Sequence, residues 1–525
     1  MKSDTQVQLK NKLTSEVVKT LPRLLTQLDR DELSPTFGCF DRNYWHYKIH
    51  DFSSIVLQQN VYALALLYWN DFPNNFLYKN KKTYSYVLGS LQFWVRSQHK
   101  NGTFDEYWPN EQGYPPLVFS THAVLKTLML FPDLKEEFRS PLKKAIHQIV
   151  LYQENNAVNQ EVAGVSCLHL YALLYKDDVT LKNFRHRLRT LLAKQTTEGW
   201  FPEYGGADIG YSSVTLHFLS EISSHLQKNG AVQKSICKLV DFLEFFTHPD
   251  GTVGGEYGSR NTEYFLLNGL VQSAVFCPKS IELLQKINWT LDKFDDRYLF
   301  HYTFISFLDG FISLDKISFP KISTHPQQDF GRKYFDESGL LVIKKKSLYF
   351  ITNLKKGGVF KLFNHNLLIT QNSGYRIPVG KSFLVTNSLT KEAVVYIDKH
   401  KVSCSVPLTN QKIYISQPWQ HMILRFTTFL PFKKWFINFL KGLLILNVKT
   451  SQYRFTRSFI LSKNELIIED CFSTDLPQAA FTHPESSLRF VPSSKFAQKE
   501  SFPLFEEKFQ CLTKGQNKSR TVIPI

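Results

Sequence analysis

The stretch from Glu198 to Tyr211, EGWFPEYGGADIGY, concentrates glycines, aromatic residues and acids in one short segment without helical periodicity. Gly205 and Gly206 can adopt backbone angles that are closed to other residues, as tight functional loops require. Aromatic side chains beside carboxylates on such a loop are typical of sugar-binding sites. The alternative is a structural turn whose aromatic side chains cap a hydrophobic core.

Two further connections resemble this loop. Residues 98–111 read QHKNGTFDEYWPNE, residues 195–208 read QTTEGWFPEYGGAD, and residues 248–261 read HPDGTVGGEYGSRN. Each follows the end of one apolar helical pattern and leads into another. A repeated unit of helix, loop and helix cannot bury its apolar face alone and must stack on its neighbours. The repeat therefore predicts a helical toroid, closed or horseshoe-shaped, whose loops converge at one end as a cleft.

The chain changes character near residue 325. Amphipathic helical segments run from Leu9 to about Phe319, and short β-rich runs separated by Gly-containing turns follow. Many strands at short spacing predict an antiparallel sandwich, and the proline-containing segment Ser318 to Gly331 predicts the boundary. We therefore expect an N-terminal (α/α) helical toroid in residues 1–325 and a C-terminal antiparallel β-sandwich in residues 326–525. The predicted helices include residues 211–227 and 263–276, and the predicted strands include residues 412–416 and 422–427.

Charge and cysteine content narrow the class of partner. The chain has 525 residues and a formal charge of +17 spread along its length, which favours nucleic acid, anionic lipid or acidic polysaccharide as partner, the alternative being a basic surface that only keeps the chain soluble. The sequence contains no zinc-finger spacing, bZIP-like basic helix or RNP-type aromatic motif, so we expect no nucleic acid. Its seven cysteines never form a CxxC pair, which indicates neither a disulfide framework nor a zinc site. The N-terminus lacks the apolar core of a secretory signal, and these features predict the cytoplasm.

The most apolar run is Trp435 to Leu446, WFINFLKGLLIL, which Lys441 interrupts and Lys433 and Lys434 precede. It is too short to span a bilayer. A basic amphipathic segment of this kind can lie flat on a membrane, here the inner face, whereas a short apolar run can equally be buried in the core. Peripheral membrane contact through this run is therefore one expectation for the chain.

Five stretches of the chain resemble the heparinase II/III-like proteins, a polysaccharide-lyase superfamily with a helical toroid and a β-sandwich. They are CFDRNYWHYK (39–48), NGTFDEYWPNEQGYPPLVFSTHAV (101–124), NQEVAG (159–164), EGWFPEYGGADIGYSSVTL (198–216) and HPDGTVGGEYGSRNTEYF (248–265). They are similar to the bacterial branch of that superfamily found among surface-glycan genes. The resemblance implies action on an acidic or amino-sugar-containing glycan by β-elimination. It implies no cofactor, and no His or Glu cluster has metal-ligand spacing.

The resemblance also implies site residues. Asn159 falls where the family asparagine holds and neutralises the substrate carboxylate, and Tyr211 falls where the family tyrosine acts as acid or base. The family histidine that follows the asparagine is replaced by Gln160, so a catalytically silent protein is an alternative. A histidine from the β-domain would be His365, in FKLFNHNLL.

The implied chemistry requires such groups. Abstracting the proton beside a uronate carboxylate requires that carboxylate to be neutralised, because negative charge develops on it. A tyrosine whose pKa is lowered by nearby cations can take the proton and return one to the leaving oxygen, and an epimerase would use the same first step. Arg260 can hold the carboxylate with its planar fork, or can instead pair with Glu256 or Glu263. The other candidate substrate-binding residues are Trp45, Trp108, Gln160, Glu161, Trp200, Glu203, Tyr204, Asp208, Glu256, Tyr257, Asn261 and Tyr264.

Other interpretations use the same residues. Paired loop carboxylates could make a glycoside hydrolase, or could simply bond loop amides. Asn159 and Glu161 could cap a helix, and His122 and His169 are expected in the core. A protein that kept the cleft without the activity would bind glycan or assist surface-polysaccharide assembly. Turns with the pattern Gln-x-x-x-Gly-x-aromatic also occur in the toroids of isoprenoid cyclases, but the chain lacks a DDxxD cluster. The sequence specifies neither the glycan, the linkage nor the oligomeric state.

Overall fold

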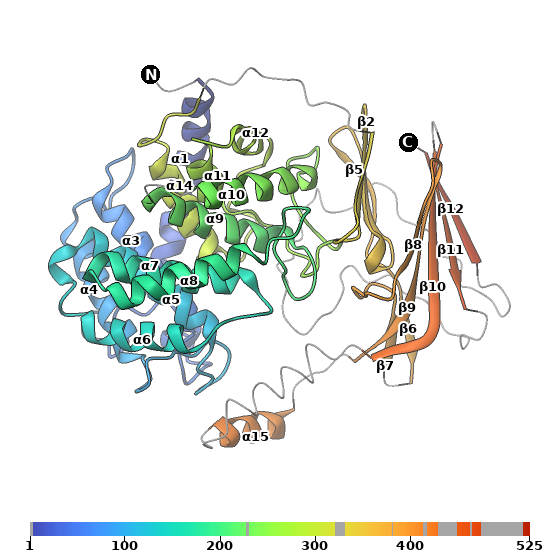
Figure 1. The fold of residues 1–525 in the computed structure, drawn as a ribbon. Coiled ribbons are helices and arrows are strands. Elements are labelled where there is room, and N and C mark those ends of the chain that lie inside the picture. Colours follow the sequence, from blue (N-terminus) through green and yellow to red (C-terminus); the bar gives the residue numbers. More distant parts are fainter. Residues whose placement is uncertain are drawn as a thin grey trace.

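The computed structural model of the chain describes residues 4–226, 230–320, 331–380, 382–412, 417–428, 449–462, 465–473 and 518–524. Within these ranges a helical part precedes a part made of antiparallel strands, in the predicted order (Figure 1). The last helix of the first part ends at Ser313, and the first strand begins at Gly331.

Six helices pack side by side in an order that returns to its start. They are α3 (Asn60–Trp69), α5 (Tyr114–Leu130), α7 (Val158–Tyr175), α9 (Ile209–His225), α11 (Leu267–Ser273) and α14 (Phe304–Ser313), and α14 packs back against α3. We call them the inner helices. Nearly every side chain of α7 and of α9 is buried, which explains why neither sequence has a marked polar face.

Six other helices pack on the inner ones. They are α1 (Asp4–Gln27), α4 (Lys81–Arg96), α6 (Arg139–Leu151), α8 (Asp178–Leu192), α10 (Gly230–Leu243) and α12 (Pro278–Lys286). These outer helices are amphipathic: α8 buries Phe184, Leu188 and Leu191 and leaves Arg185 and Arg189 exposed. Short elements connect the helices: α2 (Arg42–Trp45), η1 (Ile55–Gln59), η2 (Pro132–Leu134), η3 (Glu244–Phe246), α13 (Asp296–Tyr298) and η4 (Leu299–Thr303).

The three repeated connections share one backbone geometry. In each, a backbone N–H donates to the carbonyl four residues later, and a glycine with positive φ lies within the turn, one residue before that carbonyl, namely Gly102, Gly199 and Gly251. A Cβ atom on these glycines would lie only 2.5, 2.4 and 2.8 Å from a carbonyl oxygen of the next outer helix. Glycine is therefore required both by the backbone angle and by the close approach of that helix. Gln98 and Gln195 complete the first two turns, because each donates its side-chain amide to the glycine carbonyl.

The strands form two antiparallel sheets. The first sheet has the order β1 (Gly331–Phe335), β2 (Leu340–Lys345), β3 (Leu348–Asn353), β4 (Val359–Asn364), β5 (Leu367–Asn372). The second sheet has the order β12 (Lys518–Pro524), β11 (Glu465–Phe472), β10 (Lys449–Leu461), β9 (Lys401–Gln411), β7 (Ser382–Val385), β6 (Arg376–Val379), and β8 (Val394–Ile397) also pairs with β9.

The first sheet is buried on both faces. One face packs on the helical part, where the ring of Phe335 lies 5.2 Å from that of Phe242. The other face packs on the second sheet, where the ring of Phe350 lies 5.1 Å from that of Phe459. Every residue of β3 is consequently buried, which explains its unbroken apolar run. The molecule thus has three layers: the helices, the first sheet and the second sheet (Figure 1).

Two predicted elements differ from the structure. Residues 422–427 form part of a helix, α15 (Pro418–Thr428), and not a strand, because the apolar side chains recur at helical spacing. The helix predicted over residues 263–276 begins only at Leu267, because the preceding residues form the third loop. The predicted strand 412–416 and the run Trp435 to Leu446 lie wholly or mostly outside the described residues. No helix in the described ranges is long and apolar enough to cross a membrane.

Candidate functional site

Three segments meet at the N-terminal ends of α7 and α9: the start of α7, the turn 203–206 and the third loop. Ala157 pairs with Glu203 in a short antiparallel bridge, and Ser259 N–H donates to Ala207 O at 2.8 Å. The side chains gathered there are those of Asn159, Glu203, Tyr204, Asp208 and Arg260, which we call the Arg260 cluster.

Glu203 attaches the turn to α7. Its buried carboxylate accepts hydrogen bonds from the backbone N–H of Asn159 at 2.7 Å and from Asn159 Nδ2 at 2.6 Å. Tyr204 has a positive φ of 52° and donates its backbone N–H to Asn156 O at 2.7 Å. The amide of Asn159 is therefore bound to Glu203 and does not cap its own helix.

Arg260 lies beneath Tyr204. Its guanidinium carbon is 4.4 Å from the centre of the Tyr204 ring, and its backbone N–H donates to Asp208 Oδ2 at 2.9 Å. The residue is 3% exposed, and neither Nε nor Nη2 has a hydrogen-bond partner in the described structure. The guanidinium is thus a buried cation with two N–H directions left for an acceptor.

Tyr211 is in the first turn of α9, as predicted. Asp208 caps this helix and accepts a hydrogen bond from Tyr211 N–H at 3.2 Å. The Tyr211 ring is half-buried, with its centre 6.4 Å from that of the Tyr264 ring. Because Asp208 also binds the backbone of Arg260, one carboxylate connects both residues. Gln160, half-buried beside them, donates to the Tyr204 hydroxyl at 3.3 Å.

Burial alters the acid–base properties of the cluster. Burial raises the pKa of Glu203 well above its ordinary value, although the hydrogen bonds from Asn159 and the charge of Arg260 act in the opposite direction. Burial likewise raises the pKa of Tyr204 to about 12, against the opposing effect of Arg260. A carboxyl with a raised pKa offsets less of the positive charge of Arg260 than an ordinary carboxylate would.

Two other predicted carboxylates, those of Asp105 and Glu161, are bound by protein groups. Asp105 accepts hydrogen bonds from the backbone N–H groups of Asn110 and Gln112 at 2.8 and 2.9 Å. The fully buried Glu161 accepts two hydrogen bonds from Arg187, at 2.9 and 2.6 Å. These carboxylates are therefore occupied by protein groups, as the structural interpretation of the loops requires.

Several predicted substrate-binding residues lie where the third loop meets the first sheet. The buried ammonium of Lys356 donates to the carbonyl of Glu256 at 2.6 Å and to the side chain of Asn261. The buried Tyr257 bonds His248 through its hydroxyl at 2.9 Å, and its carbonyl accepts from Asn353 Nδ2 at 2.8 Å. In the sequence Lys356 belongs only to a Lys-Gly-Gly turn, and nothing local indicates that its charge is buried.

The remaining predicted residues make their described contacts outside the Arg260 cluster. Trp45 donates its indole N–H to Gln27 O at 2.8 Å, and the Trp108 ring lies tilted by 35° against that of Tyr107, with ring centres 6.3 Å apart. Trp200 is buried and donates to Glu198 Oε2 at 2.8 Å. His365 is exposed in the turn between β4 and β5.

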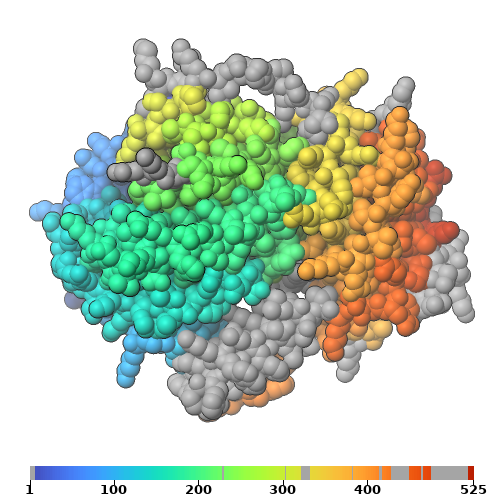
Figure 2. Space-filling model, viewed as in Figure 1, coloured from blue at the N-terminus to red at the C-terminus, as the bar shows by residue number. Residues whose placement is uncertain are grey.

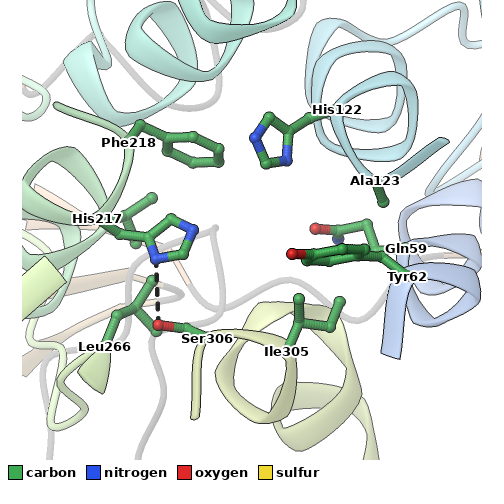
Figure 3. A pocket seen from close by; sticks show the side chains of 10 residues that line it. Gln59, Tyr62, His122, Ala123, His217, Phe218, Leu266, Ile305 and Ser306 are labelled. Atoms are coloured by element: carbon green, nitrogen blue, oxygen red, sulfur yellow. Dashed lines mark hydrogen bonds between the residues drawn. The ribbon is translucent and has the colours of Figure 1, made fainter. Parts of the chain in front are cut away.

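A second polar centre lies among the inner helices. His122 Nε2 and Lys126 Nζ lie 3.0 and 3.2 Å from the buried carboxylate of Glu221. His217, which bonds the Ser306 hydroxyl at 3.2 Å, lines a cavity of about 20 Å³ together with His122 (Figure 3). That volume admits about one water molecule and is too small for a sugar.

Charge in this centre is paired. Burial alone would raise the pKa of Glu221, but His122 and Lys126 beside it lower that pKa well below its ordinary value. Burial lowers the pKa of His217 to about 4. His122 and His169 are both buried, as predicted for core histidines. In the described ranges, no group of three or more His, Cys, Asp or Glu side chains is arranged to hold a metal ion.

Comparison with known proteins gives structural similarity only. No protein-family model matches the chain, and no curated protein sequence matches it significantly. The fold is similar to that of the Streptomyces coelicolor A3 chondroitin AC lyase, solved in complex with chondroitin sulphate, with a TM-score of 0.57 and 9% identity over 91% of this chain and 71% of that chain. It is also similar to a Paenibacillus xanthan lyase, with a TM-score of 0.51 and 13% identity over 91% of this chain and 46% of that chain. The chain therefore has the fold of polysaccharide lyases.

Proposed function

We propose that the chain binds an acidic glycan at the Arg260 cluster and cleaves it by C5 proton abstraction and β-elimination. The observation that carries this proposal is the buried guanidinium of Arg260, whose Nε and Nη2 lack partners in the described structure. Leaving a buried donor unpaired costs about 1–3 kcal/mol, and such costs are retained mainly at functional sites. A planar carboxylate matches the two free directions of the arginine fork.

The substrate class is supported by two observations. The chain carries a formal charge of +17, which attracts a polyanion. A chondroitin AC lyase of similar fold was solved with chondroitin sulphate, which is an acidic polysaccharide. Since fold alone does not determine activity, the proposal of a lyase reaction rests on the chemistry of the Arg260 cluster.

Each residue of the site has a role in the proposed reaction. Arg260 holds the uronate carboxylate and stabilises the negative charge that develops on it. Tyr211, as the phenolate, takes the C5 proton, and the C4–O bond breaks as the C4=C5 double bond forms. The protonated Tyr211 then gives that proton to the leaving oxygen, which restores the phenolate. Asn159 becomes a second donor to the carboxylate when its amide leaves Glu203, which accepts hydrogen bonds less well once protonated. The exposed His365 has no role in this scheme.

We further propose that the inner helices form an (α/α) toroid and the two sheets a β-sandwich, as the resemblance to heparinase II/III-like proteins implies. The closed order of the inner helices and the shared hydrophobic cluster of the two sheets support this description. The three repeated loops then lie before α5, α9 and α11, and the Arg260 cluster is built from the second and third of them and the start of α7.

Glycan binding without cleavage is the second candidate function. The amide of Asn159 is occupied by Glu203, and Gln160 stands where the family has a histidine and donates instead to Tyr204. A protein of this kind would serve in surface-polysaccharide assembly. We do not propose a glycoside hydrolase, because Asp105, Glu203 and Asp208 all accept hydrogen bonds that hold the loops.

The test is ultraviolet absorbance after incubation with uronate-containing polysaccharides, with a neutral glucan as control. Elimination produces a double bond conjugated to the carboxylate, so absorbance rises only if a lyase acts. Arg260→Met and Tyr211→Phe should abolish the rise. Tyr175→Phe is the matched control, because this tyrosine bonds Lys135 O at 2.6 Å and lies about 24 Å along α7 from Asn159.

The alternatives give different results in the same assay. Binding that is lost in Arg260→Met, without any absorbance change in the wild-type chain, supports the glycan-binding protein. New reducing ends without absorbance would indicate hydrolysis. If no acidic glycan binds, or if Arg260→Met binds as well as the wild-type chain, the Arg260 cluster is not the substrate site.

A further inference from the structure

The helix α15 is exposed on one apolar side. Its large side chains Trp419, Met422, Ile423 and Phe426 are 59%, 59%, 48% and 71% exposed. The helix lies apart from both sheets, at the bottom of the view in Figure 1, and its orange surface is visible at the lower edge of Figure 2. Four large apolar side chains in one short exposed helix require a partner to cover them.

These side chains form one stripe. Their positions follow the spacing i, i+3, i+4, i+7, which at 3.6 residues per turn confines them to an arc of about 100°. Arg425 lies outside that arc and forms a bidentate contact with Asp51 of the helical part, with Nη2 to Oδ1 at 3.0 Å. The contact with Asp51 holds the helix by another side and leaves the stripe uncovered.

Charge distinguishes between the kinds of partner. No Asp or Glu occurs between Asp398 and Glu465, whereas Lys433, Lys434 and Lys441 follow α15 closely in the sequence. A short helix with tryptophan and phenylalanine on one side, in an acid-free and lysine-containing region, has the composition of a segment that lies in the interface of an anionic bilayer. A protein partner would not require acidic residues to be excluded over so long a stretch.

We propose that α15 attaches the chain to an anionic membrane surface by inserting Trp419, Met422, Ile423 and Phe426 among the lipid headgroups. Tryptophan is favoured at this depth, because its ring is apolar and its N–H remains near water. The lysines that follow the helix in the sequence, Lys433, Lys434 and Lys441, add attraction to anionic headgroups. This attachment is independent of the proposed lyase activity, since neither Arg260 nor Tyr211 takes part in it.

The experiment is flotation of the purified full chain with vesicles of phosphatidylcholine alone and of phosphatidylcholine with phosphatidylglycerol. We expect the chain to float with the anionic vesicles, less so as salt is raised, and to remain behind with the neutral ones. The double variant Trp419→Ser with Phe426→Ser should bind at least tenfold more weakly. Because these side chains are exposed, the variant should unfold at the same temperature as the wild-type chain.

The matched control changes two equally exposed apolar residues of β8. Val394 and Tyr396 are 64% and 58% exposed, so Val394→Ser with Tyr396→Ser removes a similar area elsewhere. This control should float like the wild-type chain. Equal flotation of the α15 variant, or equal flotation with neutral vesicles, would overturn the proposal. A dimer seen by light scattering that the α15 variant abolishes would also overturn it, because a second copy would then cover the stripe.

Discussion

Replacing Arg260 by methionine should make the protein more stable while it removes the proposed carboxylate-binding group. A methionine side chain is apolar, unbranched and close in length to the arginine stem, so it can occupy the same space without a charge. The backbone N–H of residue 260 would still donate to Asp208, because that hydrogen bond does not involve the side chain. The variant therefore tests whether burying the guanidinium lowers the free energy of unfolding.

The magnitude follows from the contacts of the guanidinium. Its Nε and Nη2 have no partner in the described structure, and at about 1–3 kcal/mol for each unpaired buried donor the folded state is penalised by about 2–6 kcal/mol. The stacking of the guanidinium on the Tyr204 ring at 4.4 Å returns about 0.5–2 kcal/mol. Subtracting the second range from the first leaves about 0–5.5 kcal/mol, so we expect Arg260→Met to stabilise the chain by roughly 3 kcal/mol.

The assay is urea and thermal unfolding followed by tryptophan fluorescence, with Arg187→Met as the matched control. Arg187 is also buried, but its guanidinium donates to Glu161, to Ile149 O and to the Tyr114 hydroxyl. Removing it leaves a buried carboxylate unpaired, which costs about 3–5 kcal/mol. The same substitution should thus raise the unfolding midpoint at position 260 and lower it at position 187. A lower unfolding midpoint for both variants would refute the inference that the buried guanidinium of Arg260 lacks hydrogen-bond acceptors in the folded chain.

Three further predictions concern other parts of the chain. The pKa of His217 is about 4 in the folded chain and about 6.5 in the unfolded chain, so between these values the unfolded chain binds the proton more readily. Neutral His217 therefore contributes about 3 kcal/mol to the free energy of unfolding above pH 6.5, and this contribution is lost as the pH falls to 4. The free energy of unfolding should depend less on pH over this range in His217→Gln, as measured by urea unfolding at a series of pH values. Gly199→Ala should destabilise the chain by more than about 3 kcal/mol in urea unfolding, because its Cβ would lie 2.4 Å from Lys238 O; an unchanged midpoint would show that the turn can open. The side-chain hydrogen bond from Cys237 lowers the pKa of Cys277; we expect mass spectrometry after mild peroxide to find these two thiols joined, and reaction of other cysteines first would contradict this.

The order of the helical and strand parts along the chain could be predicted from the sequence, because periodicity is a local property. Helical spacing before residue 313 and short β-rich runs after residue 331 each follow from neighbouring residues. The same rule misassigned residues 422–427, where Ile423, Phe426 and Thr427 favour strands although the apolar side chains recur at helical spacing. It could not show that the first sheet is covered on both faces, because the residues that cover it come from distant segments of the chain.

The site was predictable in composition but not in its bonding. Asn159, Glu203 and Arg260 could be selected from loops rich in glycine and aromatic residues, and the structure gathers these three side chains around one turn. That the amide of Asn159 is bound to Glu203, 44 residues away, depends on how two loops pack. The buried Lys356 at the junction with the first sheet is not apparent in the sequence for the same reason.

The coverage of the first sheet on both sides has a consequence for how the protein can be divided. If the C-terminal strands were produced alone, the face that contains Phe335, Tyr349 and Phe363 would be exposed to water. Exposed apolar faces of different copies would then associate with one another. Such a fragment should collect in inclusion bodies, and a protease cut between residues 313 and 331 should leave two pieces that stay together under native conditions. The boundary between the helical part and the strands is therefore a boundary in the sequence, but the two parts are not independent folding units.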